Sequence, residues 1–242
     1  MSEVPVDPRW PTLLSLSVHE FRTPMTVVAG YIRMLLKERA GPLSDQQRRL
    51  LGEAEKSCGR LSGLLTEVSD LSNLEGGTAP LTRQKTDLHA ALRHAVEQLP
   101  PLPDREVAVD LQLDGDAAPI EADPVRLTQA FSSVIKSLRR ELIGEAPLIV
   151  RQRRTTTDGY EIQIGDEETL ASLDAEAPGT HELFDEWRGG CGLILPIARR
   201  IIEAHGGRLW GAPDGRKAGA RIQFAVSSSQ FALASAPACP RL

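Results

Sequence analysis

The chain has 242 residues, of which 41% are hydrophobic and 4% aromatic, and its formal net charge is −5. This length allows two modest domains with mostly aliphatic cores. The acidic balance argues against nucleic-acid binding, which needs an excess of Lys and Arg. No stretch approaches the ~20 consecutive apolar residues of a membrane-spanning helix. The three cysteines are far apart, which fits reduced thiols in a cytoplasmic protein and suggests no structural metal site.

Residues 10–38 are predicted to form a long helix, because apolar residues recur in alternating steps of four and three. A second helix, capped by Ser44 or Asp45, is predicted to stop at Gly76-Gly77. The two form an antiparallel hairpin, which a second copy would complete as a dimeric four-helix bundle; a hairpin covered by the second domain is the alternative. The apolar positions are Leu14, Val18, Phe21, Met25, Val28, Ile32 and Leu35, then Leu51, Ala54, Cys58, Leu61, Leu65 and Val68.

His19 lies just past this apolar seam, so its side chain is expected to point to solvent from a rigidly packed helix. A neutral imidazole has a nitrogen lone pair that can attack phosphorus. Glu20, about 100° further round the helix, can accept the other ring N–H and favour the nucleophilic tautomer. Thr23 follows one turn later, where its hydroxyl can hold a water in line with a partner's phosphoryl group. Pro24 is expected to bend the helix beside the histidine.

The run His19-Glu20-Phe21-Arg22-Thr23-Pro24 resembles, at every position, the H-box of the histidine kinases of two-component signalling. The resemblance implies that His19 is the phosphoacceptor and that Glu20 and Thr23 assist it, with Arg22 and Pro24 as supporting residues. It also implies a partner, the receiver domain of a response regulator. Cys58 is interpreted as core packing in the bundle.

The rest of the chain predicts an α+β sandwich. The domains are a dimerisation and phosphotransfer hairpin at 10–77, a linker at 78–85, the α+β domain at 86–226 and a disordered tail at 227–242. Helices are predicted at 87–98, 123–140 and 193–204, and strands at 107–113, 148–153, 160–164, 208–211 and 220–226.

This second domain resembles the GHKL-type catalytic ATP-binding domain of the same kinases. The entry to the family's N box is matched by Asp123-Pro124-Val125-Arg126-Leu127-Thr128-Gln129, and the strand with the adenine-recognising Asp is matched by Ile164-Gly165-Asp166. The second glycine box is matched by Gly189-Gly190-Cys191-Gly192-Leu193, and the end of the following helix by Glu203-Ala204-His205-Gly206-Gly207. The resemblance implies Mg-ATP as cofactor. It does not extend to every residue of the nucleotide site.

The nucleotide site is expected to be degenerate. Ser137 replaces the family's Mg²⁺-ligating Asn, and Ser133 replaces the Asn that usually precedes it. Two glycines are missing after Asp166, where Glu167-Glu168-Thr169-Leu170 stands instead. The second box keeps Gly190 and Gly192 but has Ile194 where the last glycine belongs, and only Arg188 separates Trp187 from Gly189, where the family has its flexible ATP lid.

Three hypotheses follow. The preferred one is a phosphorelay protein whose His19 exchanges phosphoryl with a receiver aspartate and whose autophosphorylation from ATP is impaired. The second is an active autokinase supported by Asp166, Gly190 and Gly192. The third is a non-catalytic dimeric scaffold that binds a partner kinase or regulator, with His19 idle. We expect that either a separate protein supplies the input signal or the chain is a piece of something longer.

Overall fold

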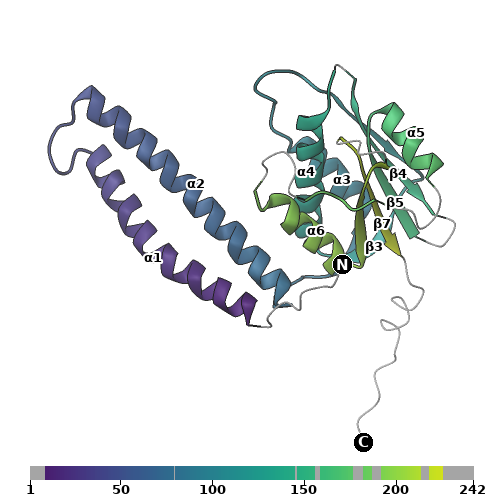
Figure 1. Ribbon diagram of the computed structural model, residues 1–242, viewed down its shortest axis with the longest axis horizontal. Coiled ribbons are helices and arrows are strands. Elements are labelled where there is room, and N and C mark those ends of the chain that lie inside the picture. Colours follow the sequence, from purple (N-terminus) through teal and green to yellow (C-terminus); the bar gives the residue numbers. More distant parts are fainter. Residues whose placement is uncertain are drawn as a thin grey trace, which may run out of the picture. The chain divides into compact units, whose positions relative to one another are not determined.

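A computed structural model describes residues 9–78, 80–144, 146–155, 159–176, 182–186, 192–213 and 218–225. The chain divides into two compact units, Met1–Ala79 and Pro80–Leu242 (Figure 1). The first is all helical and the second combines helices with a mixed sheet. This confirms the predicted fold class, a helical hairpin followed by an α+β sandwich.

The first unit is a hairpin of two long helices, α1 (Trp10–Leu36) and α2 (Asp45–Glu75). Pro11 lies in the first turn of α1, where a missing N–H costs no helical hydrogen bond. Ser44 begins α2 with a capping box, because its hydroxyl accepts from the N–H of Gln47 and the Gln47 side chain accepts from the N–H of Ser44. The starts of both helices are therefore fixed by local sequence.

The hairpin buries only part of the predicted seam. Val18, Ile32 and Cys58 are buried in it, whereas Phe21 and Val28 are exposed. At about 100° per residue, Phe21 and Val28 lie about 60–80° from Val18 around α1, and one partner helix covers only a narrow stripe. Apolar surface on α1 is thus left without a partner inside this unit.

The second unit contains two sheets. A small antiparallel pair joins β1 (Gln84–Asp87) to β3 (Pro119–Ala122). The main sheet has the order β2-β4-β5-β7-β6, in which only the β2–β4 pair is parallel. Its strands are β2 (Val109–Leu113), β4 (Leu148–Arg154), β5 (Gly159–Gly165), β6 (Gly207–Gly211) and β7 (Ala220–Ala225).

Three helices lie together on one side of the main sheet: α3 (Leu88–Glu97), α4 (Pro124–Glu141) and α6 (Ile194–Ala204) (Figure 1). The core between them is aliphatic, with an edge-to-face pair of Phe131 on α4 and Phe224 on β7 at a ring distance of 6.3 Å. A fourth helix, α5 (Glu167–Ala175), follows β5 directly and packs against it.

Some boundaries differ from the predictions. The predicted linker at 78–85 overlaps β1, because Gln84 and Lys85 pair with Ala122 and Glu121 of β3. β1, β3 and α5 were not predicted: the first two have four residues each, too few to show a period, and the start of α5 was interpreted as a replaced glycine turn. The predicted tail at 227–242 lies outside the described residues.

A buried polar junction ties the start of α4 to the end of α6. The Asp123 carboxylate caps α4 by accepting from the N–H groups of Val125 and Arg126. The N–H of Asp123 donates to Nε2 of His205 at 3.0 Å, and Nδ1 of His205 donates to the Ile201 carbonyl at 2.7 Å. His205 is therefore neutral, with its proton on Nδ1. Burial lowers the pKa of His205 below its ordinary value, more than the Ile201 carbonyl raises it.

Acid should destabilise the second unit through His205. Because the pKa of His205 is lower in the folded chain than its ordinary 6.5, the unfolded chain binds a proton that the folded chain does not. This stability is fully present above about pH 6.5 and is lost as the pH falls below that value. Urea unfolding at pH 7.5 and 5.5 should show a smaller pH dependence for His205→Gln than for the wild type. The exposed His94→Gln should behave as the wild type, and equal pH dependence in all three chains would contradict the assignment.

Candidate functional site

His19 is held at the surface by the packing of its neighbour. Val18 is 4% exposed against α2, and one further residue turns α1 by about 100°. The His19 side chain is accordingly 76% exposed. The reactive group thus sits on a packed helix yet is open to a partner, as predicted.

The Glu20 carboxylate lies beside the imidazole ring. Nδ1 of His19 is 3.5 Å from Oε1 of Glu20, at the long end of hydrogen-bond distances. A proton on Nδ1 leaves the lone pair on Nε2, the ring nitrogen farther from the backbone. Arg22 and Thr23 are exposed on the following turn, and α1 continues as one helix through Pro24.

A groove of about 530 Å³ opens beside His19, between the first turns of α1 and the last turns of α2. Ser72 closes its base by donating from Oγ to the Pro11 carbonyl at 2.6 Å. The lining mixes polar and apolar side chains and carries no acidic or basic side chain other than the histidine: Pro11, Thr12, Ser15, Leu16 and His19 face Ser72, Asn73, Gly76 and Thr78. Sequence reasoning missed this groove, because the contact joins residues 61 positions apart.

In the second unit, the predicted nucleotide residues of α4 have local structural roles. Ser133 donates from Oγ to the Gln129 carbonyl at 2.8 Å. Ser137 is 2% exposed and lies on the packed face of α4 with Val134 and Leu138. The structure therefore places both serines on α4 as expected, and buries Ser137.

Asp166 is the N-cap of α5. Its Oδ1 accepts from the N–H of Thr169 at 2.8 Å, so the carboxylate serves the first turn of this helix. Gly192 has a φ of +63°, a left-handed conformation that favours glycine. Gly190 lies outside the described residues.

Thr169 and Leu170 of α5 are buried at the end of β5. A Cβ on Gly165 would lie 2.7 Å from Cγ2 of Thr169, and a Cβ on Gly219 would lie 2.5 Å from the same atom. The threonine methyl therefore fills the space between the end of β5 and the residue before β7. This packing was not foreseen from the sequence.

Comparisons with known proteins agree with the site in the first unit. Residues 12–77 match the family model of the His Kinase A (phospho-acceptor) domain. The chain is 27% identical over 205 residues to the circadian input-output histidine kinase CikA of Synechococcus elongatus, covering 81% of this chain. It is 25% identical over 228 residues to the cell-division control histidine kinase PdhS of Brucella suis, covering 87% of this chain. Residues 12–77 therefore match a phospho-acceptor domain family, and most of the chain is similar to histidine kinases.

The fold of this chain is also found in a solved structure. The crystal structure of full-length ShkA in complex with AMPPNP matches with a TM-score of 0.65 and 22% sequence identity, over 88% of this chain and 45% of that one. The match shows the same order of hairpin and sandwich. The chain spans only 27% of the length of CikA and 20% of the length of PdhS.

Three further properties concern the part of this chain that the structure describes. Within it, no helix is long and apolar enough to cross a membrane. The same residues contain no group of three or more His, Cys, Asp or Glu side chains placed to hold a metal ion. Cys58 is buried in the hairpin, where it was predicted to pack.

Proposed function

We propose that this chain works in a phosphorelay, with His19 exchanging a phosphoryl group with an aspartate of a response-regulator receiver domain. The observation that carries the proposal is the placement of His19: a side chain that is 76% exposed, on a helix fixed by burial, with a carboxylate at its Nδ1. The match to a phospho-acceptor domain over 12–77 supports it.

The transfer needs few side chains from this chain. The Nε2 lone pair of His19 attacks the phosphorus of an aspartyl phosphate, an N–P bond forms, and the P–O bond breaks as the aspartate carboxylate leaves with its electron pair. Glu20 holds the proton on Nδ1 and stabilises the positive charge that the ring gains. Positioning of the two reactants supplies most of the acceleration. The reverse transfer uses the same geometry.

Thr23 gives the same surface a second activity. It is exposed one turn after His19, where its hydroxyl is placed to orient a water toward a docked aspartyl phosphate. Attack by that water would release inorganic phosphate from the partner. Arg22 and Pro24 act as support for this turn.

The second unit favours a phosphoryl source other than Mg-ATP bound to this chain. The carboxylate that would recognise adenine, Asp166, caps α5, and the Thr169 methyl fills the adjacent space beside Gly165. Ser137, at the Mg²⁺-ligand position, is buried and has a shorter side chain than the family's Asn. With α5 in this position, the residues present do not fit the nucleotide.

An ATP-dependent autokinase is the second candidate. The relatives CikA and PdhS are named as histidine kinases, and the ShkA structure holds AMPPNP, an ATP analogue. Gly192 keeps one glycine of the second glycine box. A third candidate is a scaffold that binds a partner kinase or a separate sensor without using His19.

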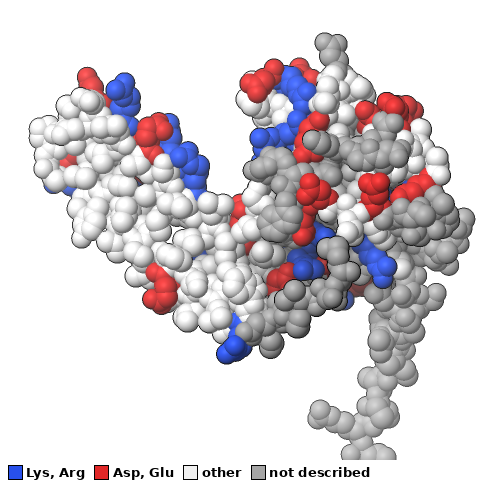
Figure 2. Space-filling model, viewed as in Figure 1, with Lys and Arg blue, Asp and Glu red and all other residues white. Residues whose placement is uncertain are grey.

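A homodimer is part of the proposal, because the hairpin has a second apolar face. Leu13, Phe21 and Tyr31 are 52%, 61% and 60% exposed, and they lie about 60–140° from Val18 in the direction away from His19. A second copy on this face would complete a four-helix bundle and leave His19 accessible. Figure 2 shows a largely uncharged surface over much of the hairpin. The exposed apolar residues are Trp10, Leu13, Leu16, Phe21, Val27, Val28, Tyr31, Met34, Leu50, Leu61 and Leu64.

Phosphotransfer is tested with a panel of receiver domains phosphorylated by acetyl phosphate. The wild-type chain should take label from at least one receiver, and His19→Gln should take none. Glu20→Gln should slow the transfer about 100-fold, because the ring loses its proton acceptor. His94→Gln, which removes an exposed histidine of the second unit, is the matched control and should keep the wild-type rate. Transfer that persists in His19→Gln would refute the assignment.

The closed nucleotide site predicts that the wild-type chain neither binds Mg-ATP saturably nor labels itself. Isothermal titration with Mg-ATP should give no saturable heat at concentrations up to about 1 mM, the upper range of typical substrate KM values. Incubation with γ-labelled ATP should give no acid-labile label. Label that appears in the wild type and is absent in His19→Gln would establish the autokinase instead.

The dimer is tested by placing charges on the second apolar face. Leu13→Glu combined with Tyr31→Glu should convert a dimer into a 26.3 kDa monomer, because each buried carboxylate would lack a partner. Arg33→Glu, on the polar side of α1, is the control and should remain dimeric. Analytical ultracentrifugation gives the mass, and a monomeric wild type would disprove the bundle.

A further inference from the structure

The sheet face opposite α3, α4 and α6 is basic. In register across β4, β5, β7 and β6, one row of side chains is Arg153, Glu161, Gln223 and Arg208, and the next is Arg151, Gln163, Arg221 and Trp210. Four arginines thus accompany one carboxylate on the sheet itself. An acidic segment packed on this face would meet complementary charge.

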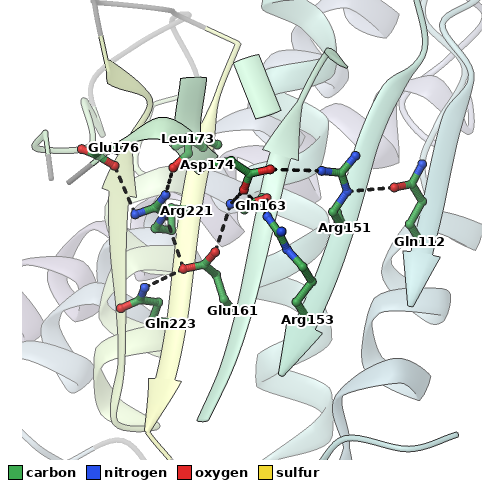
Figure 3. Close-up of polar contacts among 10 residues, drawn as sticks. All are labelled: Gln112, Arg151, Arg153, Glu161, Gln163, Leu173, Asp174, Glu176, Arg221 and Gln223. Atoms are coloured by element: carbon green, nitrogen blue, oxygen red, sulfur yellow. Dashed lines mark hydrogen bonds and ion pairs between the residues drawn. The ribbon is translucent and has the colours of Figure 1, made fainter. Parts of the chain in front are cut away.

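Such a segment is the end of α5. Asp174 lies 3.6 Å from Arg151, forms an ion pair with Arg153 and accepts from Nε2 of Gln163 at 2.8 Å (Figure 3). Glu176, just after the helix, lies 3.2 Å from Nη1 of Arg221. We name Arg151, Arg153 and Arg221 the arginine clamp.

The centre of the clamp is buried. The side chains of Arg221 and Glu176 are 7% and 4% exposed, so their pairing is little screened by solvent. Arg221 also donates to the Leu173 carbonyl in the last turn of α5, where a helix leaves carbonyls without intrahelical partners. The arginine clamp therefore holds both the side chains and the backbone at this end of α5.

The start of α5 fills the nucleotide-binding end of the sheet. The Thr169 methyl lies so close to Gly165 and Gly219 that neither position could carry a side chain. Leu170, the next residue, is 1% exposed. α5 has nine residues, too few for a stable helix without tertiary contacts. Its position therefore depends on the clamp at one end and on the packing of Thr169 and Leu170 at the other.

We propose that α5 is a latch on the nucleotide site, kept shut by the arginine clamp. With the clamp closed, Thr169 occupies the space between β5 and β7. When the clamp is released, α5 opens locally and uncovers Gly165, Gly219 and the Asp166 carboxylate, so that an adenine nucleotide can enter. The inference rests on the proposed function, in which the closed chain does not bind Mg-ATP.

The test compares the full wild-type chain with Asp174→Asn. This change removes the charge that pairs with Arg151 and Arg153 but keeps an oxygen for Gln163. Hydrogen exchange of the α5 amides should become about five- to tenfold faster, the range expected for losing two partly exposed ion pairs. The variant should also bind Mg-ATP saturably in isothermal titration. Asp104→Asn, an exposed carboxylate outside the clamp, makes the same charge change and should leave both properties as in the wild type.

A measurement at 1 M KCl makes the test independent of the substitution. Salt at this concentration screens partly exposed pairs over about 3 Å and should also speed α5 exchange in the wild type. Unchanged α5 exchange in both experiments would overturn the clamp. Faster exchange without nucleotide binding would overturn the latch and leave the proposed function intact. If the wild type and Asp174→Asn both bind Mg-ATP saturably and with the same affinity, the latch and the proposed function are both overturned.

Discussion

The burial of Val18 between α1 and α2 is the constraint on which the phosphotransfer surface depends. It fixes the rotation of α1, and a helix turns by about 100° per residue, so the next side chain must point out of the hairpin. The direction of the His19 side chain is therefore set by the rotation of a packed helix and not by a loop. The same rotation places the second apolar face on the far side of α1 from the histidine, so the proposed dimer and the proposed receiver partner would use different surfaces.

In the second unit, the Asp166 carboxylate uses one of its oxygens to cap the first turn of α5. Glycines after Asp166 would leave the backbone free to form a tight turn. Glu167 and Glu168 stand there instead, in the first turn of α5, where negative charge stabilises the N-terminus of a helix. The carboxylate then accepts from the Thr169 N–H. One local change of sequence thus converts a strand end suited to a ligand into a packed helix.

Much of this could be predicted from the sequence, because the signals are local. The apolar steps of α1, the capping box at Ser44 and the Asp123 cap of α4 each depend on residues within a few positions of one another. The contacts that escaped prediction join distant segments: the groove at His19 and the arginine clamp across three strands. α5 escaped prediction although its Asp cap and acidic first turn are local signals. The residues after Asp166 were interpreted as a replacement for the glycine turn of the family and not as the start of a helix.

Filling the nucleotide site also changes what stabilises the second unit. An open site gains stability from its ligand, and this gain rises with the logarithm of ligand concentration once the site is saturated. Here Leu170 and Leu173 of α5 are buried, and each fully buried leucine stabilises a fold by about 1.5–3 kcal/mol. The arginine clamp adds the desolvated pair of Arg221 and Glu176, and Arg221 also lies 3.6 Å from the Glu161 carboxylate. On the proposal that the site takes no nucleotide, these contacts of α5 replace the stabilisation that a ligand would supply.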